Sequence, residues 1–246
     1  MITDRRTILS AIFGASFAVR SLADAAAVAA APDSPAALYR RIPGLKLEGD
    51  EQIAMLLYPR FTALDLVGPY HFLAGLMGAK VHLVTNQQDL RPVPSDLGMA
   101  IQPTTTMADC PKDLTVIFTP GGTSGTLAAA RDQATVEFMR DQASRAQYIT
   151  SVCTGALLLM AAGPARGRRV TTHWGFVEQL RARNEAAEVL ERIRYVRDGN
   201  VVTAAGVSAG IDMALWLAGQ MHGPAAARAV QRAMEYDPAP PYAAEV

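Results

Sequence analysis

The residue in this chain most able to do covalent chemistry is a cysteine in a tight turn. Cys153 lies between the β-branched run Tyr148–Val152, which predicts a buried strand, and the apolar run Gly155–Ala162, which predicts a helix. Ser151 and Gly155, two positions before and after it, give the clearance that a strained strand-to-helix turn needs. At a helix N-terminus, partial positive charge favours a thiolate. We therefore expect a nucleophile here; the alternative is an inert, buried cysteine.

Strands and helices alternate along the rest of the chain and must position this turn. The apolar runs predict strands at 53–58, 80–85, 114–119, 148–152, 169–172 and 201–204. Helices are predicted at 64–78, 127–146, 155–162, 209–221 and 224–236, and a hairpin-like excursion at 86–111. This alternation predicts an α/β fold with a doubly wound, mostly parallel sheet.

Three polar or glycine-rich features follow predicted strands. Asp65 comes after the first strand, Gly121 and Gly122 follow the strand that ends at 119, and Cys153 follows the next one. Ligands of open α/β sheets bind outside the carboxyl ends of the strands, so we expect these residues to meet there. The alternatives are that Asp65 only caps the helix after it, and that the glycines only form a turn.

The composition is that of a globular protein and excludes several classes. The 246 residues are 50% hydrophobic and 19% charged, with 23 basic and 23 acidic side chains, so we expect no nucleic-acid partner. The two cysteines, Cys110 and Cys153, make no disulfide framework. The four histidines lack zinc-ligand spacing, so no metal is expected.

The N-terminal residues have the pattern of an export signal. Arg5 and Arg6 precede the apolar run Ile8–Val19, and an alanine-rich stretch continues to Ala31. This order predicts a twin-arginine-type signal peptide over 1–31 and a periplasmic or secreted protein. The run is too short for a stable membrane anchor. The alternative is a leader without a targeting role and a cytoplasmic protein. A proline-containing linker is expected over 32–50, and one α/β domain over 51–246.

Four segments together resemble the PfpI/ThiJ superfamily, which is related to the class I glutamine amidotransferases. They are Leu64–Pro69, Thr119–Gly122, Ser151–Gly155 and Thr171–Trp174. The likeness covers about residues 52–242 and is greatest to the isonitrile hydratase branch. It implies a flavodoxin-like three-layer α/β/α sandwich with a cysteine nucleophile elbow. It also implies a homodimer that binds a small-molecule substrate and carries no organic cofactor or metal.

The resemblance also implies roles for individual residues. Cys153 matches the nucleophile, Asp65 the acid that hydrogen-bonds it, and Thr154 a residue implicated in hydration. The backbone N–H groups of Gly122 and Thr154 match oxyanion-hole donors, and Gly121 stands beside them. The activity implied is hydration of an isonitrile to an N-substituted formamide through a cysteine thioimidate.

Two positions depart from the family pattern. Thr154 stands where the protease-like branch has histidine, and His71 stands where many relatives have an acidic residue. His173 is expected at a strand end near the pocket, as a structural or substrate-binding residue. Two other functions stay open. One is a different cysteine-dependent enzyme acting on glyoxals, other aldehydes or amides. The other is a non-catalytic ligand-binding or redox-sensing domain, like the sensor domains of some transcription regulators.

Overall fold

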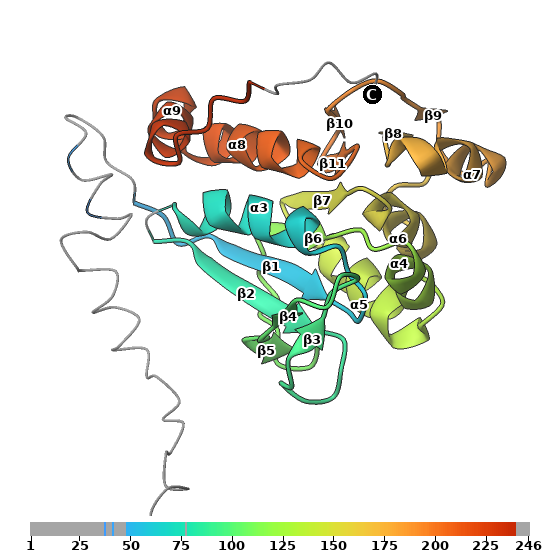
Figure 1. Ribbon diagram of the computed structural model, residues 1–246. Coiled ribbons are helices and arrows are strands. Elements are labelled where there is room, and N and C mark those ends of the chain that lie inside the picture. The colour runs from blue at the N-terminus through green and yellow to red at the C-terminus, as the bar shows by residue number, and fades with distance from the viewer. Residues whose placement is uncertain (1–36, 38–40, 42–47, 77, 240–246) are drawn as a thin grey trace, which may run out of the picture.

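A seven-stranded sheet forms the centre of the molecule in a computed structural model (Figure 1), which describes residues 37, 41, 48–76 and 78–239. The strand order is β10-β11-β7-β6-β1-β2-β5. These strands are β1 (Gln52–Leu57), β2 (Lys80–Thr85), β5 (Thr105–Thr106), β6 (Val116–Thr119), β7 (Tyr148–Val152), β10 (Tyr195–Asp198) and β11 (Val201–Ala204). All neighbours pair in parallel except β10 and β11, which are antiparallel. The mostly parallel α/β sheet predicted from the sequence is confirmed.

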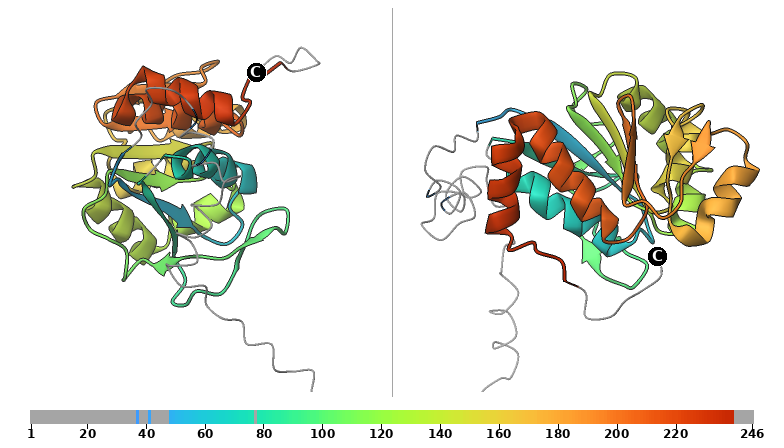
Figure 2. Two further views of the ribbon diagram at one scale, coloured as in Figure 1. Left: turned by 90° about the vertical axis from the view of Figure 1, so that its left-hand side faces the viewer. Right: turned by 90° about the horizontal axis from the view of Figure 1, so that it is seen from above.

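Helices cover both faces of this sheet. One layer holds α3 (Ala63–Ala74), α8 (Ala209–His222) and α9 (Pro224–Ala233). The other holds α4 (Ser124–Ala129), α5 (Gln133–Ala143) and α6 (Gly155–Ala162). Figure 2 shows the sheet between the two layers. This double cover explains why Ile53–Leu57 in β1 is fully buried and reads as an unbroken apolar run. The flavodoxin-like three-layer sandwich is thereby confirmed.

Two glycines bring α3 close to α8 over the sheet. A Cβ on Gly68 would lie 2.9 Å from Ile211, and one on Gly210 would lie 2.7 Å from Val152 and 3.0 Å from Pro69. No larger residue fits at either position without movement, so this contact fixes the helix that carries Asp65 against the sheet.

One predicted helix is divided in two. The sequence predicts a single helix over 127–146, but α4 ends at Ala129 and α5 begins at Gln133. Asp132 lies between them as the N-cap of α5, where its carboxylate accepts a hydrogen bond from the Thr135 N–H at 3.0 Å. A well-formed N-cap interrupts the run because it satisfies backbone donors that a continuous helix would use differently.

Short elements connect the main strands. The excursion at 86–111 contains the antiparallel pair β3 (Val93–Pro94) and β4 (Ala100–Ile101), as predicted, and then adds β5 to the sheet edge. A second small sheet pairs β8 (Arg169–Val170) with β9 (Glu188–Val189), around η1 (Trp174–Phe176) and α7 (Val177–Ala182). Residues of η1 and α7, and of the segments that follow β8 and β9, line the cavity described below.

The predicted leader, 1–31, and nearly all of the predicted linker, 32–50, lie outside the described residues. Within the described part of the chain, no helix is both long and apolar enough to span a bilayer.

Candidate active site

Cys153 occupies a strained turn at the carboxyl end of β7. Its φ is 57°, in the left-handed region that non-glycine residues rarely adopt. Its N–H donates to the Ala204 carbonyl at 3.0 Å, and its own carbonyl accepts from the Thr172 hydroxyl at 2.9 Å. A Cβ on Gly155 would lie 2.7 Å from the Thr119 carbonyl oxygen. The expected clearance by a small residue two positions after the cysteine is therefore confirmed.

Asp65 points into the site from the first turn of α3. Its Oδ2 accepts a hydrogen bond from the Gly121 N–H at 2.9 Å, and its Oδ1 is buried without a hydrogen-bond partner. The Cys153 thiol lies close enough to this carboxyl group for each of the two to shift the pKa of the other. Thr62, and not Asp65, stands at the N-cap of α3. Asp65 therefore faces the cysteine, and the reading of it as a helix cap is wrong.

Burial sets the protonation of both groups. It raises the pKa of Asp65 to about 7, although the Gly121 N–H and the Cys153 thiol act in the opposite direction. It also raises the pKa of Cys153 to about 12, with help from the charge of Asp65 and against the Thr154 N–H. We expected the helix N-terminus to favour a thiolate at Cys153. That expectation is wrong, because desolvation and a neighbouring carboxylate outweigh the helix end. At neutral pH the resting cysteine is a thiol.

The glycine pair fills the space between these groups. A Cβ on Gly121 would lie 2.6 Å from Asp65 Oδ2, 2.7 Å from Cys153 Cβ and 2.9 Å from Thr154 N. Gly122 has a φ of 148°, and a Cβ there would lie 2.3 Å from the Arg60 carbonyl oxygen. These glycines are thus more than turn formers, since any side chain at Gly121 would separate the acid from the cysteine.

The two expected oxyanion donors differ in their hydrogen bonds. The Gly122 N–H donates to the Thr154 hydroxyl oxygen at 3.0 Å, so it is already in use in this structure. The Gly121 N–H is held by Asp65. The backbone N–H of Thr154 lies close enough to the Cys153 sulfur to lower the pKa of that thiol. Of the three amides, the one at Thr154 therefore acts on the reacting atom.

His173 lies beside the cysteine. It is the N-cap of η1, and its Nδ1 accepts a hydrogen bond from the Gly175 N–H at 3.2 Å. Burial lowers its pKa, so the ring is neutral at pH 7. A Cβ on Gly206 would lie 3.1 Å from its Cδ2 and 3.4 Å from the Cys153 sulfur. His173 is therefore a structural residue that also borders the reacting group.

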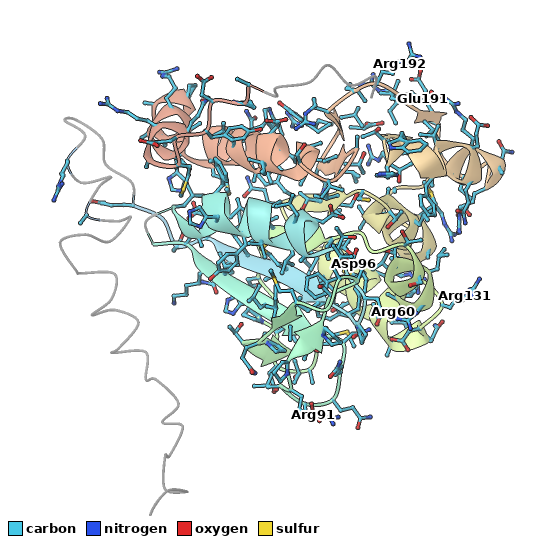
Figure 3. The ribbon with its side chains drawn as sticks, viewed as in Figure 1. Arg60, Arg91, Asp96, Arg131, Glu191 and Arg192 are labelled. Atoms are coloured by element: carbon cyan, nitrogen blue, oxygen red, sulfur yellow. The ribbon has the colours of Figure 1, made fainter. Side chains whose placement is uncertain are left out.

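A cavity of about 470 Å³ opens next to this cysteine. Its lining includes Gly206, which adjoins the Cys153 sulfur, and the Thr172–His173 segment. Apolar and charged side chains share the remaining walls: Leu64, Trp174, Val177, Ile193, Glu191, Arg192 and Arg194. Figure 3 shows Glu191 and Arg192 on the β9–β10 connection, away from Arg60 and Asp96. The volume suits a small organic molecule.

Several site residues were not found from the sequence. Gly206 separates Cys153 from His173, and Tyr58 and Thr126 form a buried hydroxyl chain beneath Thr154. A tyrosine at the end of an otherwise aliphatic run was the available signal for Tyr58. Neither His71, which is exposed, nor Cys110, which is buried, lines the cavity.

The described residues contain no group of three or more His, Cys, Asp or Glu side chains that could hold a metal ion. The reactive groups of the site are thus the carboxyl of Asp65, the thiol of Cys153, the hydroxyl of Thr154 and the amides around them.

Comparison with known proteins shows the family of this chain. The model of the DJ-1/PfpI family matches residues 51–220. The chain is 48% identical over 191 residues to an isonitrile hydratase of Pseudomonas putida, covering 78% of this chain and 81% of that protein. A ThiJ/PfpI family protein of Pseudomonas syringae superposes with a TM-score of 0.76 at 47% identity, covering 82% of this chain and 81% of that one. DJ-1beta of Drosophila melanogaster shares the fold, with a TM-score of 0.68 at 22% identity over 76% of this chain and 98% of that one. The chain belongs to the DJ-1/PfpI family.

Proposed function

We propose that this protein is an enzyme that hydrates an isonitrile to an N-substituted formamide. The observation that carries the proposal is the pairing of a neutral, buried thiol with a carboxyl group whose pKa lies at about 7. Addition of a thiol to an isonitrile carbon forms one C–S bond and one C–H bond, so it needs a sulfur and a proton donor side by side. The 48% identity to an isonitrile hydratase supports the same activity.

In the first step, Asp65 protonates the terminal carbon of the isonitrile as the Cys153 sulfur attacks it. The thiol proton passes to Asp65, which lies close enough to Cys153 to shift its pKa, so the carboxyl group is protonated again. The product is a thioimidate, R–N=CH–S–Cys. The Thr154 N–H, which lies close to the sulfur, stabilises negative charge that develops there.

In the second step, water adds to the thioimidate carbon while its nitrogen takes up a proton. Asp65 and Thr154 both lie next to Cys153 around Gly121, so in this proposal they hold the water that attacks the carbon. The tetrahedral adduct then collapses, the C–S bond breaks, and the sulfur regains its proton. The balance is one isonitrile and one water consumed for one formamide released.

A panel of substrates tests this proposal. We expect the purified protein to convert simple alkyl and aryl isonitriles to formamides, followed as loss of the isonitrile infrared band. Cys153→Ala should abolish turnover. Cys110→Ala removes the other buried cysteine and should leave turnover unchanged, because Cys110 lies in the connection between β5 and β6 and not in the turn between β7 and α6. Normal turnover by Cys153→Ala would refute the covalent route.

The same panel separates the other readings of the site. If the protein turns over methylglyoxal faster than every isonitrile, it is a glyoxal-consuming thiol enzyme instead. If it turns over neither isonitriles nor methylglyoxal, and peroxide rapidly oxidises Cys153 to a sulfenic acid, it is a redox sensor. We expect slow oxidation, because peroxides attack the thiolate and burial keeps Cys153 protonated.

Export and self-association are further parts of the proposal. The arginine pair and apolar run of residues 1–31 support twin-arginine export, which a fusion of these residues to a reporter enzyme would test. Exposed apolar side chains on the β3–β4 connection, Leu97 at 93% and Met99 at 57%, support a homodimer. Light scattering should give about twice the mass of one chain.

A further inference from the structure

A chain of buried hydroxyl groups runs from Thr154 into the core. The Thr154 Oγ1 lies 2.9 Å from Thr126 Oγ1, which lies 2.9 Å from the Tyr58 hydroxyl oxygen. The Tyr58 hydroxyl donates to the Pro120 carbonyl at 2.5 Å. All three hydroxyl-bearing residues are 0–1% exposed, so water does not replace any of these partners.

The two ends of the chain fix the direction of every hydrogen bond in it. A carbonyl oxygen only accepts, so the single Tyr58 proton is used on Pro120, and Tyr58 must accept from Thr126. Thr126 has then used its proton and must accept from Thr154. The other end agrees, because the Gly122 N–H donates to the Thr154 oxygen. Each hydroxyl donates once and accepts at least once.

The consequence concerns the Thr154 hydroxyl. Its proton is directed at Thr126, away from the reacting cysteine, and one of its two lone pairs receives the Gly122 N–H. Its other lone pair accepts no hydrogen bond within the described residues, and Cys153 is the adjacent residue, with a sulfur close enough for this hydroxyl to affect its pKa. Toward the substrate, Thr154 can therefore accept a hydrogen bond but has none to donate.

We propose that Thr126 and Tyr58 are positioning residues that hold the Thr154 hydroxyl as a hydrogen-bond acceptor toward the reacting atoms. In this role Thr154 accepts a hydrogen bond from the hydrating water and turns a lone pair of the water toward the thioimidate carbon. This assignment to the hydration step rests on the proposed function. The direction of the hydrogen bonds between the three hydroxyl groups does not rest on the proposed function, since it follows from the hydrogen-bond partners alone.

Alkylation of Cys153 by iodoacetamide tests the polarity without any substrate. In Thr126→Val the Thr154 proton loses its acceptor and becomes free to donate to the sulfur, which stabilises the thiolate and lowers its pKa by about one. A tenfold larger thiolate fraction, offset by the lower nucleophilicity of a less basic thiolate, should make alkylation about threefold faster at pH 8.5. Thr126→Ser restores the acceptor and should restore the slower rate.

A matched control keeps the test specific. Thr150 is also fully buried, and its hydroxyl donates to the Ile117 carbonyl at 3.1 Å, outside the chain described above. Thr150→Val should therefore leave the alkylation rate of Cys153 unchanged. Peptide mass spectrometry assigns the label to Cys153 and not to Cys110. An unchanged or slower rate in Thr126→Val, or an equal increase in Thr150→Val, would overturn the proposal.

Turnover provides the second readout. With an alkyl isonitrile we expect Thr126→Val to lower kcat about tenfold at unchanged KM, and the thioimidate to accumulate as a mass adduct of the protein. Thr126→Ser should show neither effect. If the wild type hydrates no isonitrile, the proposed function fails while the alkylation result still decides the polarity. If the wild type is active and kcat of Thr126→Val is normal, the positioning role fails alone.

Discussion

Replacing Asp65 by asparagine should stabilise the folded protein, and more strongly as the pH rises. Asp65 is fully buried, and its pKa is about 7 in the fold against about 3.9 in an unfolded chain. Between these values the folded protein keeps a proton that the unfolded chain has lost. The free energy of unfolding of the wild type therefore falls as the pH rises from about 4 to about 7, and levels off above that. Asparagine does not ionise, so the variant does not lose this free energy of unfolding as the pH rises.

The magnitude follows from the two pKa values. The ionisation of Asp65 costs the folded state about 1.5 kcal/mol at pH 5 and about 4 kcal/mol at pH 8. The stability of Asp65→Asn relative to the wild type should thus increase by about 2.5 kcal/mol between these pH values. Asparagine keeps an oxygen that can accept from the Gly121 N–H. Cys153 stays a thiol throughout, because its pKa is about 12.

Urea unfolding at pH 5, 6, 7 and 8 measures this difference. All other titratable groups are the same in both proteins, so their contributions cancel in the comparison. Asp198→Asn is the control: the Arg169 N–H and Arg168 hold the pKa of Asp198 below its usual range, so its carboxylate is ionised in both states above pH 5. That variant should differ from the wild type by a constant amount. A constant difference for Asp65→Asn as well would refute the raised pKa, and with it the proton donor of the mechanism.

Four further outcomes follow from the geometry. The kcat/KM for isonitrile hydration should fall about tenfold per pH unit above pH 7, because only the protonated form of Asp65 donates, and a flat profile to pH 9 would contradict this. Gly121→Ala should lower kcat at least a hundredfold, since its Cβ would lie 2.6 Å from Asp65 Oδ2; turnover near the wild-type rate would show that the acid and the thiol need not touch. Thr172→Val should cost about 1 kcal/mol in urea unfolding, because the Cys153 carbonyl loses its hydroxyl donor. Gly206→Ala should lower the melting temperature and slow alkylation of Cys153, because its φ is 153° and its Cβ would lie 3.4 Å from the sulfur.

The elements around the elbow could be predicted to the residue. The bounds predicted for Tyr148–Val152, Gly155–Ala162 and Val201–Ala204 are those observed. These segments are covered on both faces, so burial alone dictates their composition and marks their ends. The helix predicted over 127–146 failed because its periodicity continues through a residue that caps a new helix. Local capping there prevailed over the hydrophobic pattern.

The strand at one edge of the sheet was harder to find. The antiparallel β10 was missed, although the Gly199-Asn200 pair between β10 and β11 is a hairpin turn signal. Its burial pattern is mixed, so no apolar run marks it. The cavity itself combines α3 with segments more than a hundred residues further along the chain. No local pattern encodes such a meeting.

The protonation of the site could not be predicted from the elbow motif, and it bears directly on the chemistry. A helix N-terminus contributes about 1 kcal/mol or less to a nearby anion, whereas full burial shifts a pKa by several units. At Cys153 burial prevails, and the adjacent carboxylate adds to it. The Oδ1 atom of Asp65 is buried and has no hydrogen-bond partner. This agrees with the raised pKa, because a buried carboxyl oxygen without a donor is best tolerated when the group is protonated.

A neutral thiol beside a protonated acid suits addition to an isonitrile better than a preformed thiolate would. The reaction needs a proton at carbon, and a site with a thiolate and a carboxylate would hold none. The same neutrality protects the cysteine, since oxidants act on the thiolate. For the exported protein that we propose, this protection applies in a compartment without a thiol-reducing system. In the proposed mechanism Asp65 protonates the isonitrile carbon as the sulfur adds to it, so the addition needs no preformed thiolate.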